Sequence, residues 1–198
     1  MIKQKNQRIL AIDPGTRQMG IAVLEDRELI YHGVETLTSH GPPHERLLEG
    51  RRILLRLLDD FKPGIVAVEA AFFSNNRNTA LLNVLVDELR ALATRRGLSV
   101  HGFAPSTIKR HMCGNGWAVK ADVAKAVVVK YPKLRVYLTQ DRKWKERYHG
   151  NMFDAVAVGI VSQDQLAAKT HEKTRRPSQE KPAAQASSLI RPSNADKN

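Results

Sequence analysis

The first part of the chain alternates short apolar runs with turns. Residues 8 to 13, 20 to 25 and 28 to 37 are rich in Ile, Leu, Val and Ala, and "PGTRQ" and "EDRE" separate them. Runs of this length between turn residues are typical of β-strands, and short connections favour antiparallel pairing of consecutive strands. We therefore predict an antiparallel three-stranded meander.

The middle of the chain alternates helical and strand patterns. Leucines recur at helical spacing in "ERLLEGRRILLRLLDDF" and in "NTALLNVLVDELRALATRRG", and Gly97 stands where a left-handed C-cap belongs. Between these helices, "GIVAVEA" has the continuous apolar character of a strand buried on both faces. "LSVHGFA" follows the second helix as another short strand.

Three more helices are expected in the second half. One opens at Pro105, one lies in "KADVAKAVVVKYP" and stops at Pro132, and the last runs from about Asn151 to Ala168. The remaining polar, proline-bearing segment lacks periodicity, so we expect a disordered basic tail over residues 169–198. The element order predicts an α/β fold over residues 1–168, with a central mixed five-stranded sheet flanked by helices.

The charge of the chain indicates a polyanionic partner. Its 198 residues include 32 basic and 20 acidic side chains, which give a net charge of +12 and a pI near 10.1. Only seven of the basic and three of the acidic residues fall in the last 30 positions, so most of the excess belongs to the predicted domain. Such a balance favours nucleic acid as the partner.

Other features limit the class of protein. No apolar run approaches the length needed to cross a bilayer, and "MIKQKNQRIL" has no apolar signal region, so we expect no membrane association and a cytoplasmic location at nucleoid or infected-cell DNA. The single cysteine, Cys113, lacks the clustered Cys and His residues of a zinc site. We interpret it as a reduced packing residue.

Three acidic residues stand at positions where a site can form, although each also has an ordinary structural explanation. Asp13 precedes Pro-Gly, as in a common turn, and Glu69 ends a buried strand, where an exposed rim or a basic partner would also account for it. Asp154 lies three residues after Asn151, a good helix N-cap, so its charge also suits the first turn. Three carboxylates without Cys/His clusters suggest Mg²⁺ or Mn²⁺ and phosphodiester hydrolysis.

The stretches "ILAIDPGTRQMGIAVL" and "IVAVEAAFFSNN" resemble the first two motifs of RuvC-type Holliday junction resolvases, over a region from about Arg8 to Val161. The resemblance implies a ribonuclease H-like fold and a homodimeric, structure-selective endodeoxyribonuclease that cuts four-way DNA junctions by paired symmetric nicks. It places two Mg²⁺ or Mn²⁺ ions on Asp13, Glu69 and Asp154. The family usually has another Asp or His ligand where this chain has Asn151, which is therefore a weaker candidate ligand.

The resemblance also implies DNA contacts. Phe72 matches an aromatic that the family uses near the junction centre, although Phe72 or Phe73 could instead pack in the core, and Lys120 is expected close to the scissile phosphate. The window from Gly97 to Ala121 contains no acid, so its bases are free to face phosphates. The stretch "KLRVYLTQDRKWKERYHG" mixes bases and aromatics, as either a DNA-contact insert or a surface loop packed on the body. The candidate DNA contacts are Phe72, Phe73, Lys109, Arg110, Lys120, Arg142, Lys143, Lys145 and Arg147.

Alternative functions remain open at this level. Asn151 is compatible with a catalytically weak or inactive junction-binding protein, and "IDPGTRQMGIAV" also resembles a nuclease of the same fold that processes ribosomal RNA precursors. An actin-like ATP-binding protein shares an Asp-x-Gly-Thr turn, but 198 residues leave no room for its two halves. For the homodimer, we expect an interface that includes the helix from Asn78 to Arg96.

Overall fold

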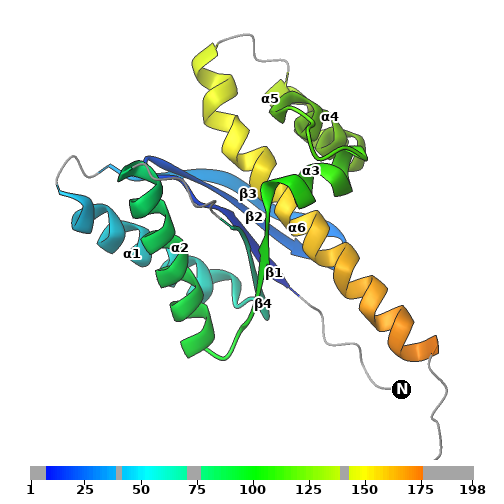
Figure 1. Ribbon diagram of the computed structural model, residues 1–198, viewed down its shortest axis with the longest axis horizontal. Coiled ribbons are helices and arrows are strands. Elements are labelled where there is room, and N and C mark those ends of the chain that lie inside the picture. The colour runs from blue at the N-terminus through cyan, green and yellow to red at the C-terminus, as the bar shows by residue number, and fades with distance from the viewer. Residues whose placement is uncertain (1–7, 39–41, 71–76, 139–142, 176–198) are drawn as a thin grey trace, which may run out of the picture.

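A five-stranded mixed sheet forms the centre of the protein (Figure 1). The computed structural model describes residues 8–38, 42–70, 77–138 and 143–175. The strands lie in the order β3-β2-β1-β4-β5. They are β1 (Ile9–Asp13), β2 (Gln18–Glu25), β3 (Glu28–Thr36), β4 (Ile65–Glu69) and β5 (Ser99–Phe103). The first three are antiparallel and β4 and β5 are parallel to β1, which confirms the predicted meander and mixed sheet.

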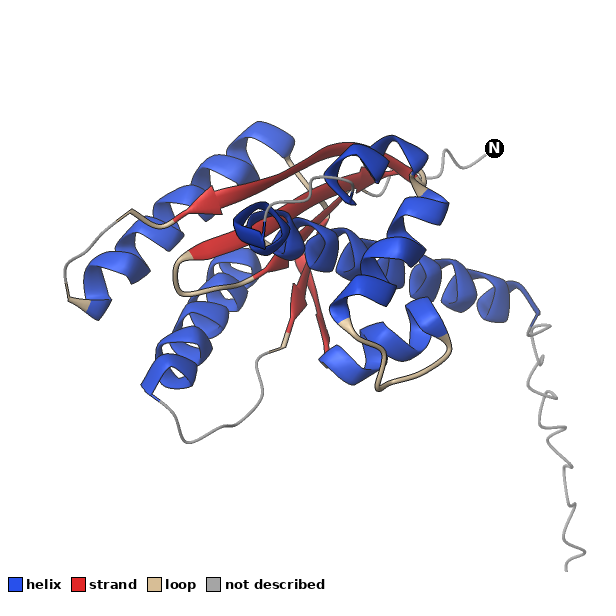
Figure 2. Ribbon diagram, turned by 90° about the horizontal axis from the view of Figure 1, so that it is seen from above, coloured by secondary structure: helices blue, strands red, loops and turns tan. Residues whose placement is uncertain are grey.

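Helices cover both faces of the sheet. They are α1 (Pro43–Phe61), α2 (Arg77–Arg95), α3 (Pro105–Cys113), α4 (Lys120–Lys130), α5 (Arg135–Leu138) and α6 (Lys143–Arg175), with a 3₁₀ turn over Pro132–Leu134. The helices α1 and α2 lie on one side, and α6 lies on the other side with α3, α4 and α5 outside it (Figures 1 and 2). Of the helices in the described ranges, none combines the length and the apolar character needed to cross a bilayer.

The central strand β1 is buried on both faces. Leu10 and Ile12 pack in one apolar cluster with α1 and α2, whereas Ile9 and Ala11 pack in another with α6 and α4. Side chains of a strand point alternately to opposite faces, so a strand covered on both sides needs a continuous apolar run. This burial explains why four apolar residues precede Asp13.

The long helix α6 lies unusually close to the sheet because small residues stand at the crossing. A Cβ atom on Gly20 of β2 would collide with the backbone carbonyl oxygen of Asn151. Further along α6, a Cβ atom on Gly159 would lie 3.2 Å from that of Ala11 and would collide with Leu24. A glycine inside a strand often marks such a close approach of another backbone.

The predicted start of the last helix is wrong. Helix α6 begins at Lys143, so Asn151 is not an N-cap and Asp154 does not lie in the first turn. The segment "KWKERY" consists largely of good helix formers, and a Cβ atom on Gly150 would meet nothing within 4 Å, so nothing interrupts the helix there. The expected surface loop after Pro132 is therefore largely helical where it is described.

The other end of α6 also differs from expectation. The helix continues to Arg175 instead of ending near Ala168, so the predicted tail begins inside a helix. Residues 176–198 lie outside the described ranges. By contrast, the predicted C-cap of α2 is confirmed, since Gly97 has a positive φ of 71°.

Candidate active site

Two acids stand at the carboxyl ends of neighbouring parallel strands. The paired register of β1 and β4 ends one residue before Asp13 and Glu69, so the two residues lie at the same level of the sheet. Both continue the rows of Ala11 and Ala67, whose side chains pack on the α6 face. The topology thus brings Asp13 and Glu69 together at one edge, as the sequence predicts.

The third acid reaches the same edge from α6. The side chain of Asp154 is only 13% exposed, and its Oδ2 accepts a hydrogen bond of 2.7 Å from Nζ of Lys120. Lys120 is the first residue of α4, so the ion pair fixes the start of one helix against the middle of another. Lys120 therefore stands beside the acids, and its expected place close to the scissile phosphate stays a prediction.

The electrostatics show that these groups act on one another. Burial, and then the charges of Glu69 and Asp154, raise the pKa of Asp13 well above its usual value, against the effect of Lys120. Burial and Asp154 raise the pKa of Glu69 to about 7, although Lys120 and Lys109 oppose the rise. Burial and mutual repulsion therefore outweigh the effect of the neighbouring lysines on these two carboxyl groups.

Lys120 stays protonated beside these acids. Burial works to lower its pKa, but the charge and hydrogen bond of Asp154, with the charges of Asp13 and Glu69, raise it above the ordinary value. An ammonium group has three N–H donors, so the one directed to Asp154 leaves others for a phosphate oxygen.

Asn151 has a structural role that the sequence did not indicate. Its Nδ2 donates a hydrogen bond of 3.2 Å to the backbone carbonyl of Gln18, at the start of β2. The amide thereby ties α6 to the sheet just before the close approach at Gly20. A hard metal ion would use the carbonyl oxygen of this side chain, because the amide nitrogen is only a donor.

The acids suit a hard divalent cation by their chemistry, although they are not arranged as a preformed cage. Among the described residues, no group of three or more His, Cys, Asp or Glu side chains is placed to hold a metal ion as the side chains stand. Lys120 occupies the position at Asp154 Oδ2 that a cation would compete for. The donors are carboxylate oxygens, and burial first and mutual repulsion second raise the pKa values of Asp13 and Glu69, an effect that a bound cation would oppose.

Basic residues of α3 stand beside the acids. Lys109 is half-buried and acts on Glu69, whereas Arg110 is exposed. Of the other candidate DNA contacts, Phe72, Phe73 and Arg142 lie outside the described residues. The structure gives only the backbone of the remaining three, which belongs to α6: Lys143, Lys145 and Arg147.

A cavity of about 680 Å³ borders the ion pair between α4, α5 and α6. Its lining combines cations with aromatic rings, among them Lys120, Lys125, Tyr137, His149 and Phe153. The rings of Tyr137 and His149 lie 4.7 Å apart between their centroids. This mixture of charge and aromatic surface suits a nucleotide next to the reacting phosphate.

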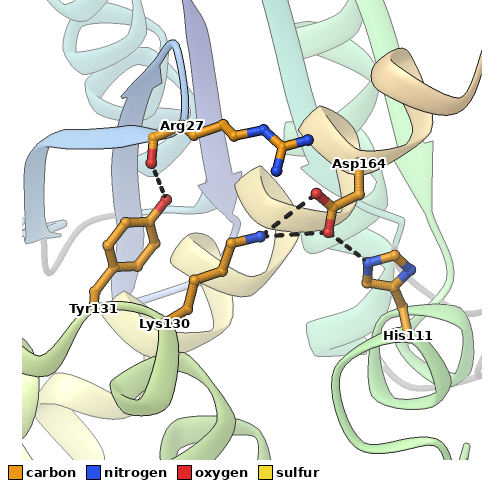
Figure 3. Close-up of polar contacts among 5 residues, drawn as sticks. All are labelled: Arg27, His111, Lys130, Tyr131 and Asp164. Atoms are coloured by element: carbon orange, nitrogen blue, oxygen red, sulfur yellow. Dashed lines mark hydrogen bonds and ion pairs between the residues drawn. The ribbon is translucent and has the colours of Figure 1, made fainter. Parts of the chain in front are cut away.

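A second polar cluster, which the sequence analysis missed, holds α3, α4 and α6 together (Figure 3). Asp164 of α6 accepts a hydrogen bond of 2.9 Å from Nε2 of His111, and Nζ of Lys130 lies 3.4 Å from the same oxygen. Next to Lys130, the hydroxyl of Tyr131 donates to the backbone carbonyl of Arg27. These contacts join residues far apart in sequence, so no local sequence pattern predicts them.

Comparison with known proteins agrees with this geometry. A family model described as crossover junction endodeoxyribonuclease RuvC matches residues 9–161. Curated RuvC proteins of Mycolicibacterium vanbaalenii and Synechococcus sp. are 35% and 34% identical over 126 and 125 residues, each match covering 61% of this chain. The matches span 65% of the Mycolicibacterium protein and 81% of the Synechococcus protein.

Solved structures show the same fold. The chain superposes on Thermus thermophilus RuvC, solved in complex with a Holliday junction substrate, with a TM-score of 0.65 and 21% identity, covering 83% of this chain and 97% of that one. This likeness shows the fold, which is ribonuclease H-like. The family match covers more than half of the sequence. The chain therefore belongs to the RuvC family of crossover junction endodeoxyribonucleases.

Proposed function

We propose that this protein resolves four-way DNA junctions by paired symmetric nicks, using two Mg²⁺ or Mn²⁺ ions in each active site. The observation that carries the proposal is the convergence of Asp13, Glu69 and Asp154 beside Lys120 in a chain of the RuvC family. Nucleases of this family depend on metal ions. The Thermus relative was solved with a Holliday junction substrate, which supports branched DNA as the partner.

The residues divide the work of phosphodiester hydrolysis. Asp13, Glu69 and Asp154 would hold the ions, which supply an activated water and stabilise the leaving oxygen. Lys120 orients Asp154 and offers its other N–H donors to the phosphate, where negative charge grows in the transition state. Lys109 adds positive charge at Glu69. The expected products carry a 5′-phosphate and a 3′-hydroxyl.

The proposal retains Asn151 as a structural residue and the acids as the ligands. A non-catalytic role would be favoured if the family's fourth ligand were essential. In this chain the amide of Asn151 anchors α6 to β2, which positions Asp154 one helical turn later. The residue therefore contributes to the site without needing to carry charge.

We further propose that the active form is a cytoplasmic homodimer, because a two-fold protein places equivalent sites on two symmetry-related strands. The leucines Leu85, Leu89 and Leu92 of α2 are buried inside the chain, so they are not available to a partner. The expected interface on α2 must use the outward face, where Val84 is 51% exposed. Leu48 of neighbouring α1 is 58% exposed and extends this face.

Junction cleavage tests the proposed activity. With Mg²⁺ or Mn²⁺, the wild-type protein should nick a synthetic four-way junction at paired symmetric positions. Asp13→Asn removes a ligand charge, so it should bind the junction but cut it roughly 10³-fold more slowly, about 4 kcal/mol of transition-state stabilisation. Denaturing gels measure cutting and mobility shifts measure binding.

The matched control is Asp164→Asn, which removes the same charge from the distant end of α6 and should cut like the wild type. An intact junction after incubation with wild-type protein in both metals would contradict the nuclease proposal. Preferential cleavage of structured RNA would favour an RNA-processing nuclease instead.

A further inference from the structure

One large apolar side chain stands almost fully in solvent three residues before Lys120 of the candidate site. Trp117 is 90% exposed, more than any other large hydrophobic residue in the described ranges. Tryptophan carries a large apolar surface that proteins normally bury at least in part. Val119, two residues later, is also 59% exposed. This apolar tip lies on the connection between α3 and α4.

The connection holds Trp117 in a defined position. Helix α3 ends at Gly114, whose φ of 73° turns the chain sharply. The side-chain Oδ1 of Asn115 then accepts a hydrogen bond of 3.0 Å from the backbone N–H of Trp117. The backbone N–H of Ala118 donates to the carbonyl of Asn115, and Ala118 itself is buried. The ring is thus presented by a turn that is anchored on both sides.

Cations surround this turn. Lys120 follows Trp117 by three residues and pairs with Asp154 of the site. On the other side, a Cβ atom on Gly116 would lie 3.8 Å from a guanidinium nitrogen of Arg110. No acid occurs from Gly97 through Ala121, and the two acids that contact the end of this turn are already engaged, Asp122 with the backbone N–H of Val119 and Asp154 with Lys120. An exposed aromatic ring between two basic side chains can contact nucleic acid in two ways. The basic side chains bind the phosphate backbone and the ring stacks on a nucleobase.

We propose that Trp117 stacks on a nucleobase of the DNA strand that enters the active site, one left unpaired or at the end of a duplex arm where the junction branches. The inference rests on the proposed junction-cutting function and adds Trp117 to the residues that contact the junction. The flanking Arg110 and Lys120 hold the backbone, and the ring fixes the register of the strand against the acids. A protein partner would find here only Trp117 and Val119 beside two cations, a small apolar area for a hot spot.

Substitution tests the stacking directly. Trp117→Ala should weaken junction binding by roughly 5- to 150-fold, the range for loss of one base–aromatic stack. Trp117→Phe should restore most of the affinity because it keeps an aromatic face. Val129→Ala is the matched control, since Val129 is 82% exposed on α4 and should bind like the wild type. Because the side chain is exposed, thermal unfolding of all three variants should match the wild type.

Fluorescence provides a readout that a structural role would not change. The chain has two tryptophans, Trp117 and Trp144, so Trp144→Phe leaves Trp117 as the single reporter. Its emission should be quenched as a four-way junction is added without metal, and the quenching should saturate at the affinity given by mobility shifts.

The outcomes separate this inference from the proposed function. Wild-type protein that binds and cuts the junction, with unchanged affinity for Trp117→Ala and no change in Trp117 emission, would overturn the stacking and leave the nuclease intact. Wild-type protein that neither binds nor cuts would overturn both. Normal junction binding by Trp117→Ala with loss of a protein partner would assign the ring to a protein interface and also reject the stacking.

Discussion

Helices α4 and α6 are joined by two Lys–Asp ion pairs, and the charges around the two pairs differ. Asp154 and Asp164 stand ten residues apart on α6, about 15 Å along its axis, and each pairs with a lysine of α4. Lys120 pairs with Asp154 and Lys130 with Asp164, so the two helices run side by side in the same direction. Only one of the two pairs belongs to the active site.

Charge balance distinguishes the two ends. At Asp164 one acid meets Lys130 and His111, and although burial works against it, these contacts lower the pKa of the carboxyl. At Asp154 one lysine faces three acids, and the pKa values of Asp13 and Glu69 rise instead. A cluster whose charges are paired stabilises the scaffold, whereas buried carboxyl groups with raised pKa values are typical of a functional site.

The largest effect should come from exchanging the two lysines for alanine. Lys120→Ala removes the cation that we propose contacts the phosphate, so we expect cleavage to fall by about 10²- to 10³-fold, as for loss of one preorganised transition-state donor. Lys130→Ala should leave cleavage nearly unchanged and lower the free energy of unfolding by about 1 kcal/mol or less. Single-turnover cleavage and urea denaturation of both variants measure the contrast. Equal losses of activity would show that the two ends are not functionally distinct.

Local patterns in the sequence were sufficient for most of the sheet. The meander follows from short apolar runs between turns, and the cap of α2 follows from the conformational freedom of Gly97. The start of α6 could not be found this way because Gly150-Asn151 resembles a boundary. The helix continues through it because "KWKERY" consists largely of good helix formers, which extend α6 ahead of the part that packs in the core from Met152 onward.

The acids of the site were predictable for a topological reason. Asp13 and Glu69 end parallel neighbouring strands, and the carboxyl ends of such strands lie at one edge whatever the loops do. The pairing of Lys120 with Asp154, the anchoring of Asn151 to β2 and the exposure of Trp117 depend on how helices distant in sequence meet the sheet. Sequence spacing alone carries no information on those contacts.

The next prediction concerns how the stability of the protein depends on pH through Glu69. The folded-state pKa of Glu69 is about 7, against an ordinary value of 4.5, so the folded protein binds this proton more tightly than the unfolded chain does. Stability from this group is therefore largest in acid and is lost as pH rises through about 7. In EDTA, the melting temperature of the wild type should fall between pH 5 and pH 8.

Glu69→Gln cannot titrate at this position, so its melting temperature should fall less over the same range and exceed that of the wild type at pH 8. Thermal scans at four pH values measure the difference. If the melting temperatures of the two proteins changed equally with pH, the pKa of Glu69 would not be raised in the folded state.

The smallest effect is expected at the balanced end. The pKa of Asp164 is lowered in the folded protein, so its contribution to stability is present above its ordinary value near 3.8 and is lost as pH falls through the folded-state value. Asp164→Asn should thus lower the free energy of unfolding at pH 7 by about 1 kcal/mol or less, and the deficit should shrink toward pH 3. Urea denaturation at pH 7 and pH 3 measures the sign of this pH dependence, which is opposite to that of Glu69→Gln. The folded Asp164→Asn variant could instead lose as much cleavage as Lys120→Ala. That result would mean that the cluster of His111, Lys130 and Asp164 sets the geometry of the active site. The rigid helices α4 and α6 would then transmit the change over their whole length.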